Sequence, residues 1–68
     1  MYKITKETKH GIGTYKCNLA TERSAKMVLD DLKNTHNKLG HIVYYHGDAI
    51  SVSSEEETFL VKYTILKQ

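Results

Sequence analysis

The sequence predicts an α+β fold, in which one amphipathic helix packs on one face of a mostly antiparallel β-sheet in the order β-β-α-β-β-β. Two observations carry this prediction. Apolar residues recur at helical spacing in the middle of the chain, and the segments on either side alternate between apolar and polar residues around short glycine-containing turns. We expect one small domain over residues 1–68. A domain of this size buries only about 60% of the surface of its unfolded chain, so a second subunit would help its thin core.

The N-terminal stretch predicts a β-hairpin closed by a His10-Gly11 loop, although Gly13 leaves a longer turn or a bulge open. The resulting pairs are Ile4 with Cys17 and Tyr2 with Leu19. Alternation along the strands then assigns one set of side chains to the core. The predicted core face holds Tyr2, Ile4, Tyr15, Cys17 and Leu19. The opposite face holds Lys3, Thr5, Lys16 and Asn18.

A single helix is predicted over residues 22–39. Its apolar stripe follows the spacing of one helical face and consists of Ala25, Val28, Leu29, Leu32, His36 and Leu39. Thr21 is a suitable N-cap, and Glu22 lies where a negative charge favours the helix dipole. Lys38 falls in the last turn, and Gly40 can adopt the left-handed C′ conformation. Both ends of the helix are therefore marked in the sequence.

The stretch "HIVYYHGDAISVS", residues 41–53, predicts a second hairpin with a two-residue Gly47-Asp48 loop. The expected pairs are Val43 with Val52, Tyr44 with Ser51, Tyr45 with Ile50 and His46 with Ala49. The core face would hold Val43, Tyr45, Ile50 and Val52, and the other face Ile42, Tyr44, His46, Ser51 and Ser53. The adjacent tyrosines thus point to opposite sides of the sheet.

The last strand is predicted from about Thr58 to Lys67, after an exposed acidic link "SSEEE". Its core face consists of Phe59, Val61, Tyr63 and Ile65. Its back face consists of Leu60, Lys62, Thr64 and Leu66. The uncovered face of the sheet would then be more apolar than contact with water alone requires.

Composition favours an ordinary globular protein, with 40% hydrophobic and 26% charged residues. No apolar run is long enough to span a bilayer and the N-terminus lacks a signal peptide, so we expect a soluble, cytoplasmic protein without a membrane partner. The single cysteine excludes an internal disulfide and a multi-cysteine zinc site. Net charge runs from +3 over residues 1–20, through +1 over 21–40, to −2 over 41–68. A basic N-terminal end of this kind can meet phosphate or an acidic partner.

Catalytic and metal signals are weak. His36, His41 and His46 recur every five residues, a spacing that spans different elements and predicts no local ligand pair. His46 near Asp48 lies at a turn, and Cys17 is predicted to be a small core residue rather than a nucleophile. The segment "KHGIGTYK" lacks the spacing and the strand-to-helix context of a phosphate-binding loop. We therefore expect no enzymatic activity, small-molecule substrate, metal or cofactor.

Two binding functions remain. In the first, the open sheet face or a sheet edge docks on another protein or on a second copy, through Ile42, Tyr44, Leu60 and Leu66. In the second, a basic sheet face binds nucleic acid through Lys3, Lys16, Tyr44, His46 and Lys62. Protein binding is favoured because five of the six aromatic residues are predicted to point inward, leaving few to stack on bases. A third reading leaves the back face as a merely tolerant surface. Small regulators or inhibitors of bacteriophages and mobile elements often take this form, which is the context we expect.

Overall fold

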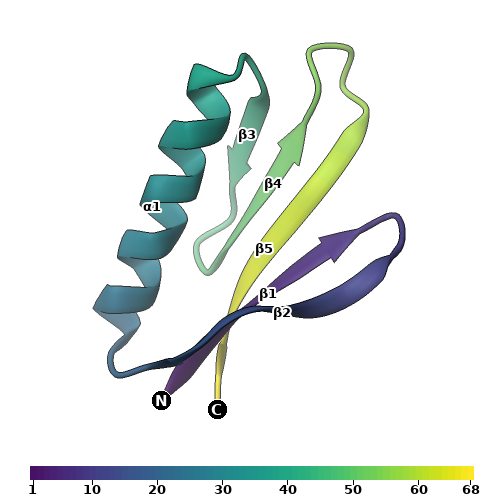
Figure 1. The fold of residues 1–68 in the computed structure, drawn as a ribbon. Coiled ribbons are helices and arrows are strands. Elements are labelled where there is room, and N and C mark those ends of the chain that lie inside the picture. Colours follow the sequence, from purple (N-terminus) through teal and green to yellow (C-terminus); the bar gives the residue numbers. More distant parts are fainter.

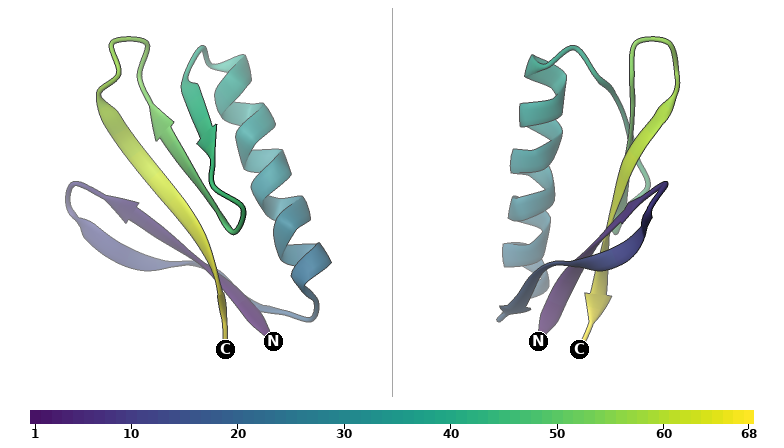
Figure 2. Two further views of the ribbon diagram at one scale, coloured as in Figure 1. Left: turned by 180° about the vertical axis from the view of Figure 1, so that it is seen from behind. Right: turned by 45° about the vertical axis from the view of Figure 1, so that its right-hand side comes forward.

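The computed structural model covers residues 1–68 and shows one helix packed against a five-stranded antiparallel sheet, which confirms the predicted α+β class (Figure 1). The elements are β1 (Tyr2–Thr8), β2 (Gly11–Leu19), α1 (Glu22–Lys38), β3 (Ile42–Tyr45), β4 (Ala49–Ser53) and β5 (Phe59–Lys67). The strand order is β2-β1-β5-β4-β3, so the last strand lies between the two hairpins. Helix α1 covers one face of the sheet, and no element covers the other (Figure 2).

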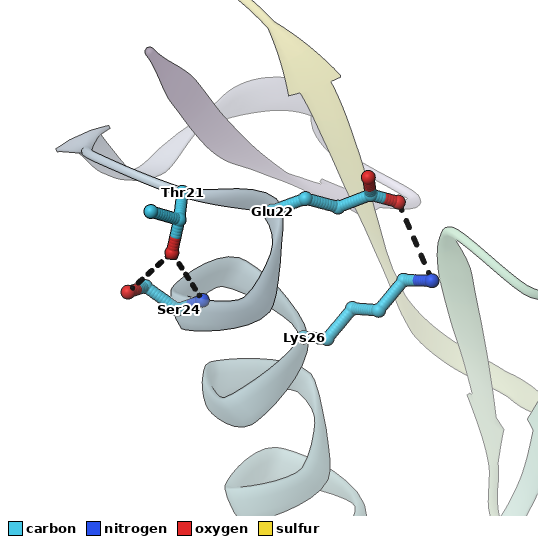
Figure 3. Close-up of polar contacts among 4 residues, drawn as sticks. All are labelled: Thr21, Glu22, Ser24 and Lys26. Atoms are coloured by element: carbon cyan, nitrogen blue, oxygen red, sulfur yellow. Dashed lines mark hydrogen bonds and ion pairs between the residues drawn. The ribbon is translucent and has the colours of Figure 1, made fainter.

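The N-terminus of α1 is capped as predicted. Thr21 is the N-cap, and its Oγ1 accepts a hydrogen bond of 3.0 Å from the backbone N–H of Ser24. The Thr21 hydroxyl also donates to Ser24 Oγ at 2.9 Å (Figure 3). One turn further, Lys26 Nζ lies 3.3 Å from Glu22 Oε1. This i,i+4 pair is exposed to solvent, so it contributes little to stability.

The C-terminus of α1 is closed by a Schellman motif around Gly40, which has the left-handed φ of +81°. The backbone N–H of Gly40 donates to Asn37 C=O at 3.1 Å, and that of His41 donates to His36 C=O at 3.0 Å. A Cβ at position 40 would be strained by this φ and would meet Glu55 Oε1 at 3.1 Å. Gly40 therefore fixes where the helix ends and the chain turns into β3.

The core lies between α1 and the helix-facing side of the sheet. Its largest fully buried side chains are Ile4, Leu29, Ile50 and Val52. Ala25, Val61, Tyr63 and Ile65 complete the buried cluster. Leu39, which was predicted to end the apolar stripe, is instead exposed because it is the C-cap, beyond the last turn that packs on the sheet.

The second hairpin has the predicted register, with Val43, Tyr44 and Tyr45 opposite Val52, Ser51 and Ile50. The predicted burial of Tyr45 is wrong, however, and its side chain is half exposed. β3 is an edge strand, so Tyr45 has a neighbouring strand on one side only. Burial on the helix-facing side therefore decreases toward this edge.

An irregularity in the β4–β5 pairing changes the prediction for the start of β5. Val52 pairs with Val61, but Ser53 pairs with Phe59, so one residue of β5 is left over. Because a one-residue slip exchanges the two faces of a strand, Phe59 is exposed rather than in the core. Leu60, which was predicted to lie on the open back face, is half-buried and packs against the core.

The first hairpin differs more from the prediction. Thr8 pairs with Gly11, so the loop is Lys9-His10 and lies one residue earlier than predicted. Two register shifts then follow, and they restore the predicted pairing of Tyr2 with Leu19.

Between these shifts, Ile4 pairs with Lys16 rather than with Cys17. Cys17 is therefore exposed instead of buried. Asn18 has a positive φ of 59° and lies at the second shift. The predicted core face of this strand is thus wrong at Cys17, because a bulge inverts the alternation that follows it, whereas Leu19 packs against the core as predicted once the second shift has restored the register.

No helix is long and apolar enough to cross a membrane.

The packing of α1 predicts unequal costs for two neighbouring truncations. Leu29→Ala should lower the free energy of unfolding by about 2 to 5 kcal/mol, because Leu29 is fully buried among strands that cannot close the cavity. Met27→Ala, at an exposed position of the same helix, should change it by less than about 0.5 kcal/mol. Urea denaturation of both variants measures the difference, and similar costs would contradict the helix phase described above.

Candidate functional site

The residues predicted to bind a protein do not form one patch. Ile42 and Tyr44 share the back side of β3. Leu60 is half-buried against the core. Leu66 is exposed, but it lies four residues along β5 from Lys62, which shares a row of the sheet with Tyr44. Four residues of strand span roughly 13 Å, so the structure brings Ile42 and Tyr44 together and separates Leu66 from them.

The lysines of the alternative nucleic-acid site are also divided. Lys62 and Lys3 lie on the back face, Lys62 directly opposite Glu7 and Lys3 opposite Leu66. Lys16 lies opposite Ile4, whose side chain is buried beneath the helix, so the prediction that Lys16 shares the back face is wrong. The first bulge in β2 causes this change of side. The back face therefore holds two of these lysines with an acidic residue beside one of them.

The aromatic residues are more exposed than predicted, and the prediction that five of six point inward is wrong because Phe59 lies on the back face opposite Ser53. Four have side chains about half exposed, namely Tyr15 (45%), Tyr44 (47%), Tyr45 (51%) and Phe59 (43%). Only Tyr63 is buried, at 4%. Tyr15 and Tyr45 lie on the two edge strands of the sheet, and the bulge in β5 exposes Phe59. The number of exposed aromatics therefore no longer separates protein binding from nucleic-acid binding.

The edge of β3 presents unpaired backbone groups. β3 pairs only with β4, and the N–H of His46 extends this pairing by donating to Ala49 C=O at 2.8 Å. Hydrogen-bonded pairs alternate along an antiparallel ladder, so Ile42 and Tyr44 also direct their N–H and C=O groups toward β4. Val43 and Tyr45 direct theirs outward, where this chain supplies no partner.

The two edges of the sheet are protected to different degrees. β2 is long but is interrupted by two register shifts and carries Lys16, features that discourage pairing with another strand. β3 has no bulge in its pairing with β4, and no charged residue or proline. Its flanking side chains are the exposed Tyr44 on one face and Tyr45 on the other. β3 therefore lacks the bulges and charges of β2, and its one protective feature is its length of four residues.

A second feature is a pair of histidines at the C-terminus of α1, which the sequence analysis placed apart. His36 Nδ1 lies 2.9 Å from His41 Nδ1. The ring centroids are 5.2 Å apart, a distance equal to the Nδ1–Nδ1 separation plus about two imidazole ring radii. The rings therefore face each other nearly head-on, and one Nδ1–H donates to the other Nδ1. The sequence predicted no local ligand pair among these histidines, and it gave no expectation that His36 and His41 would bond to each other.

The Schellman motif explains the contact. It brings the side chains of C3 and C″ together, and these positions are His36 and His41. The signal for this contact in the sequence is Gly40. A glycine at C′ places the next residue, His41, against the residue four positions before the glycine, His36. His46, by contrast, is exposed near the β3–β4 turn and does not join the pair.

The surroundings of His36 favour its neutral ring. Burial lowers the pKa of His36 below its usual value, and the nearby His41 and Lys6 lower it further. Beneath it lies the ring of Tyr63, whose centroid is 6.2 Å from that of His36. Burial and Tyr15, whose ring meets Tyr63 edge-on at 5.2 Å, raise the pKa of the Tyr63 hydroxyl. The chain has no cluster of three or more histidine, cysteine, aspartate or glutamate side chains placed to hold a metal ion.

Comparison of this chain with models of protein families, with curated proteins and with solved structures finds no match. The chain is a small α+β protein whose β2 edge is interrupted by two register shifts and whose β3 edge is regular.

The histidine pair predicts a loss of stability as pH falls. The lowered pKa of His36 means that the unfolded chain binds a proton more readily than the folded one, so the free energy of unfolding should fall as pH decreases through about 6.5. Protonation of His36 at Nδ1 would also remove an acceptor from the Nδ1–Nδ1 contact. His36→Asn keeps a polar atom near the Nδ1 position but cannot titrate. Chemical denaturation between pH 7.5 and 5.5 should show a flatter dependence for this variant, and equal slopes would contradict the assignment.

Zinc should leave the melting temperature nearly unchanged. The two Nδ1 atoms are 2.9 Å apart and point at each other, whereas a zinc ion between them would need about 2.0 to 2.1 Å to each. Only a ligand that binds the native state raises its stability. Differential scanning fluorimetry with zinc and with a chelator measures this, and a zinc-dependent rise that His41→Ala abolishes would show that the rings rearrange around metal.

Proposed function

We propose that this chain is a non-enzymatic protein-binding module, a small regulator or inhibitor, that accepts a partner strand on the free edge of β3. The observation that carries the proposal is the pair of outward-facing residues, Val43 and Tyr45, on an edge strand that has no bulge, charged residue or proline. Strand addition uses such backbone groups for affinity and the flanking side chains for specificity. Tyr44 and Tyr45 would contact the added strand from the two faces of the sheet.

The sheet face supports this function less well than the edge. Its central rows carry mainly polar side chains, among them Thr5, Glu7, Ser51, Lys62 and Thr64. Apolar residues lie at the periphery, at Ile42 and Tyr44 on one side and at Leu66 on another. A protein interface usually has an apolar centre and a polar rim, which is the reverse of this arrangement.

Nucleic-acid binding is the second candidate, supported by Tyr15 and Lys16 side by side on β2. Stacking of bases requires aromatic faces along a basic track. The ring of Tyr15 is already engaged edge-on by Tyr63, and the most exposed tyrosine pair lies on β3, at the opposite edge of the sheet from the lysines of the first hairpin. This separation favours protein binding.

A photo-crosslinking amino acid at Tyr45 tests the proposal in cells that express the chain, with the same probe at Tyr15 as the matched control on the protected edge. We expect a protein adduct from position 45 and little or none from position 15. Val43→Pro should remove the adduct, because it deletes an outward N–H while sparing the bonds to β4. Tyr45→Lys, tested with a probe at Tyr44, should weaken capture by placing a charge at the edge.

Two other results would contradict the proposal. Adducts that survive Val43→Pro in a variant with unchanged circular dichroism would contradict strand addition. Micromolar oligonucleotide binding that weakens with salt and with Lys16→Ala would establish the second candidate instead, since each lost phosphate contact flattens the salt dependence.

A further inference from the structure

The edge of β3 is complementary to itself. The segment paired with β4 runs from Ile42, opposite Ser53, to His46, bonded to Ala49, and its midpoint is Tyr44. The outward-facing residues, Val43 and Tyr45, lie symmetrically on either side of this midpoint. A two-fold axis at Tyr44 therefore places the outward N–H and C=O groups of one copy opposite the outward C=O and N–H groups of another.

We propose that the occupant of the β3 edge is a second copy of this chain, whose β3 pairs antiparallel with the first across a two-fold axis at Tyr44. This inference rests on the proposed function and names its partner. Val43 of each copy pairs with Tyr45 of the other, which satisfies all four outward N–H groups and all four outward C=O groups. The two sheets then join into one continuous ten-stranded sheet.

This register is preferred over its neighbours by backbone hydrogen bonding. A shift of two residues in one direction would oppose Tyr45 to His41, whose N–H is already committed to His36 C=O at 3.0 Å. A shift in the other direction would oppose Val43 to Gly47, which lies in the hairpin turn with a φ of +77°. Either shift loses about half of the bonds between the copies.

Charge and side-chain chemistry fit a second copy. Residues 41–47 contain no lysine, arginine, aspartate or glutamate, so a symmetric contact opposes no like charges. Tyr44 meets Tyr44 of the other copy at a pair without hydrogen bonds, the closer kind, where aromatic contacts stabilise best. On the helix-facing side Tyr45 meets Val43, an aromatic and β-branched pair.

The protected β2 edge determines that this association stops at two copies. A chain with two open edges would propagate by edge pairing, but the bulges of β2 and its Lys16 oppose such growth. β3 pairing with β3 is isologous and uses up the open edge of each copy. The product is a closed dimer rather than a fibre.

A cysteine placed on the axis tests the register. In a Cys17→Ser background, Tyr44→Cys should form a disulfide-linked dimer under mild oxidation, because cross-strand positions of this kind lie about 4.5 Å apart between Cα atoms. Ile42→Cys is the matched control, because Ile42 of one copy lies roughly 13 Å along the strand from Ile42 of the other. Sedimentation equilibrium of the parent chain should show a monomer–dimer equilibrium, and Val43→Pro should raise its dissociation constant about tenfold or more.

Failure of this inference differs from failure of the proposed function. Equal crosslinking of Tyr44→Cys and Ile42→Cys, or a parent chain that stays monomeric at millimolar concentration, would overturn the second copy as the partner. If that monomer still gives an adduct with a different protein from a probe at Tyr45, and Val43→Pro removes it, the proposed function stands without this dimer. If the monomer gives no adduct at all, both are wrong.

Discussion

The contact between a narrow stripe of α1 and the middle of the sheet holds the molecule together. Only nine of its 68 residues are buried, and Leu29 and Ala25 are the buried residues that the helix contributes. They meet Ile4 from the first hairpin and Ile50 and Val52 from the second. Eight of the nine form one cluster between the helix and the sheet, so the positions of both edges, and of the histidine pair above Tyr63, depend on how the helix packs there.

Features specified by local signals could be predicted from the sequence. The N-cap at Thr21, the C′ glycine at Gly40 and the register of the Gly47-Asp48 hairpin are each encoded within a few residues, and the structure has all three. The faces of β2 and of the start of β5 could not be predicted from the sequence. A bulge exchanges the two faces of a strand, and the order of apolar and polar residues does not show where the bulge lies. Lys16, Cys17 and Phe59 are misassigned for this reason.

The candidate site was predicted only in part. Tyr44 and Ile42 were singled out, but their position on an edge depends on strand order, which arises because β5 inserts between β1 and β4. No local pattern encodes that insertion. The contact of His36 with His41 could have been predicted from the sequence. A helix that ends at a left-handed C′ residue, here Gly40, brings these two positions together.

The central position of β5 also determines the order in which this chain can acquire its structure. Each hairpin and the helix consist of contiguous residues, but β5 is the last strand, and it alone joins β1 to β4. Tyr2 finds its neighbour Lys67 near the other end of the chain, a contact that closes almost the longest loop available. The two hairpins therefore share a sheet only after β5 has docked between them. We expect this docking to limit the rate of folding, because it forms the contacts with the largest separation in sequence.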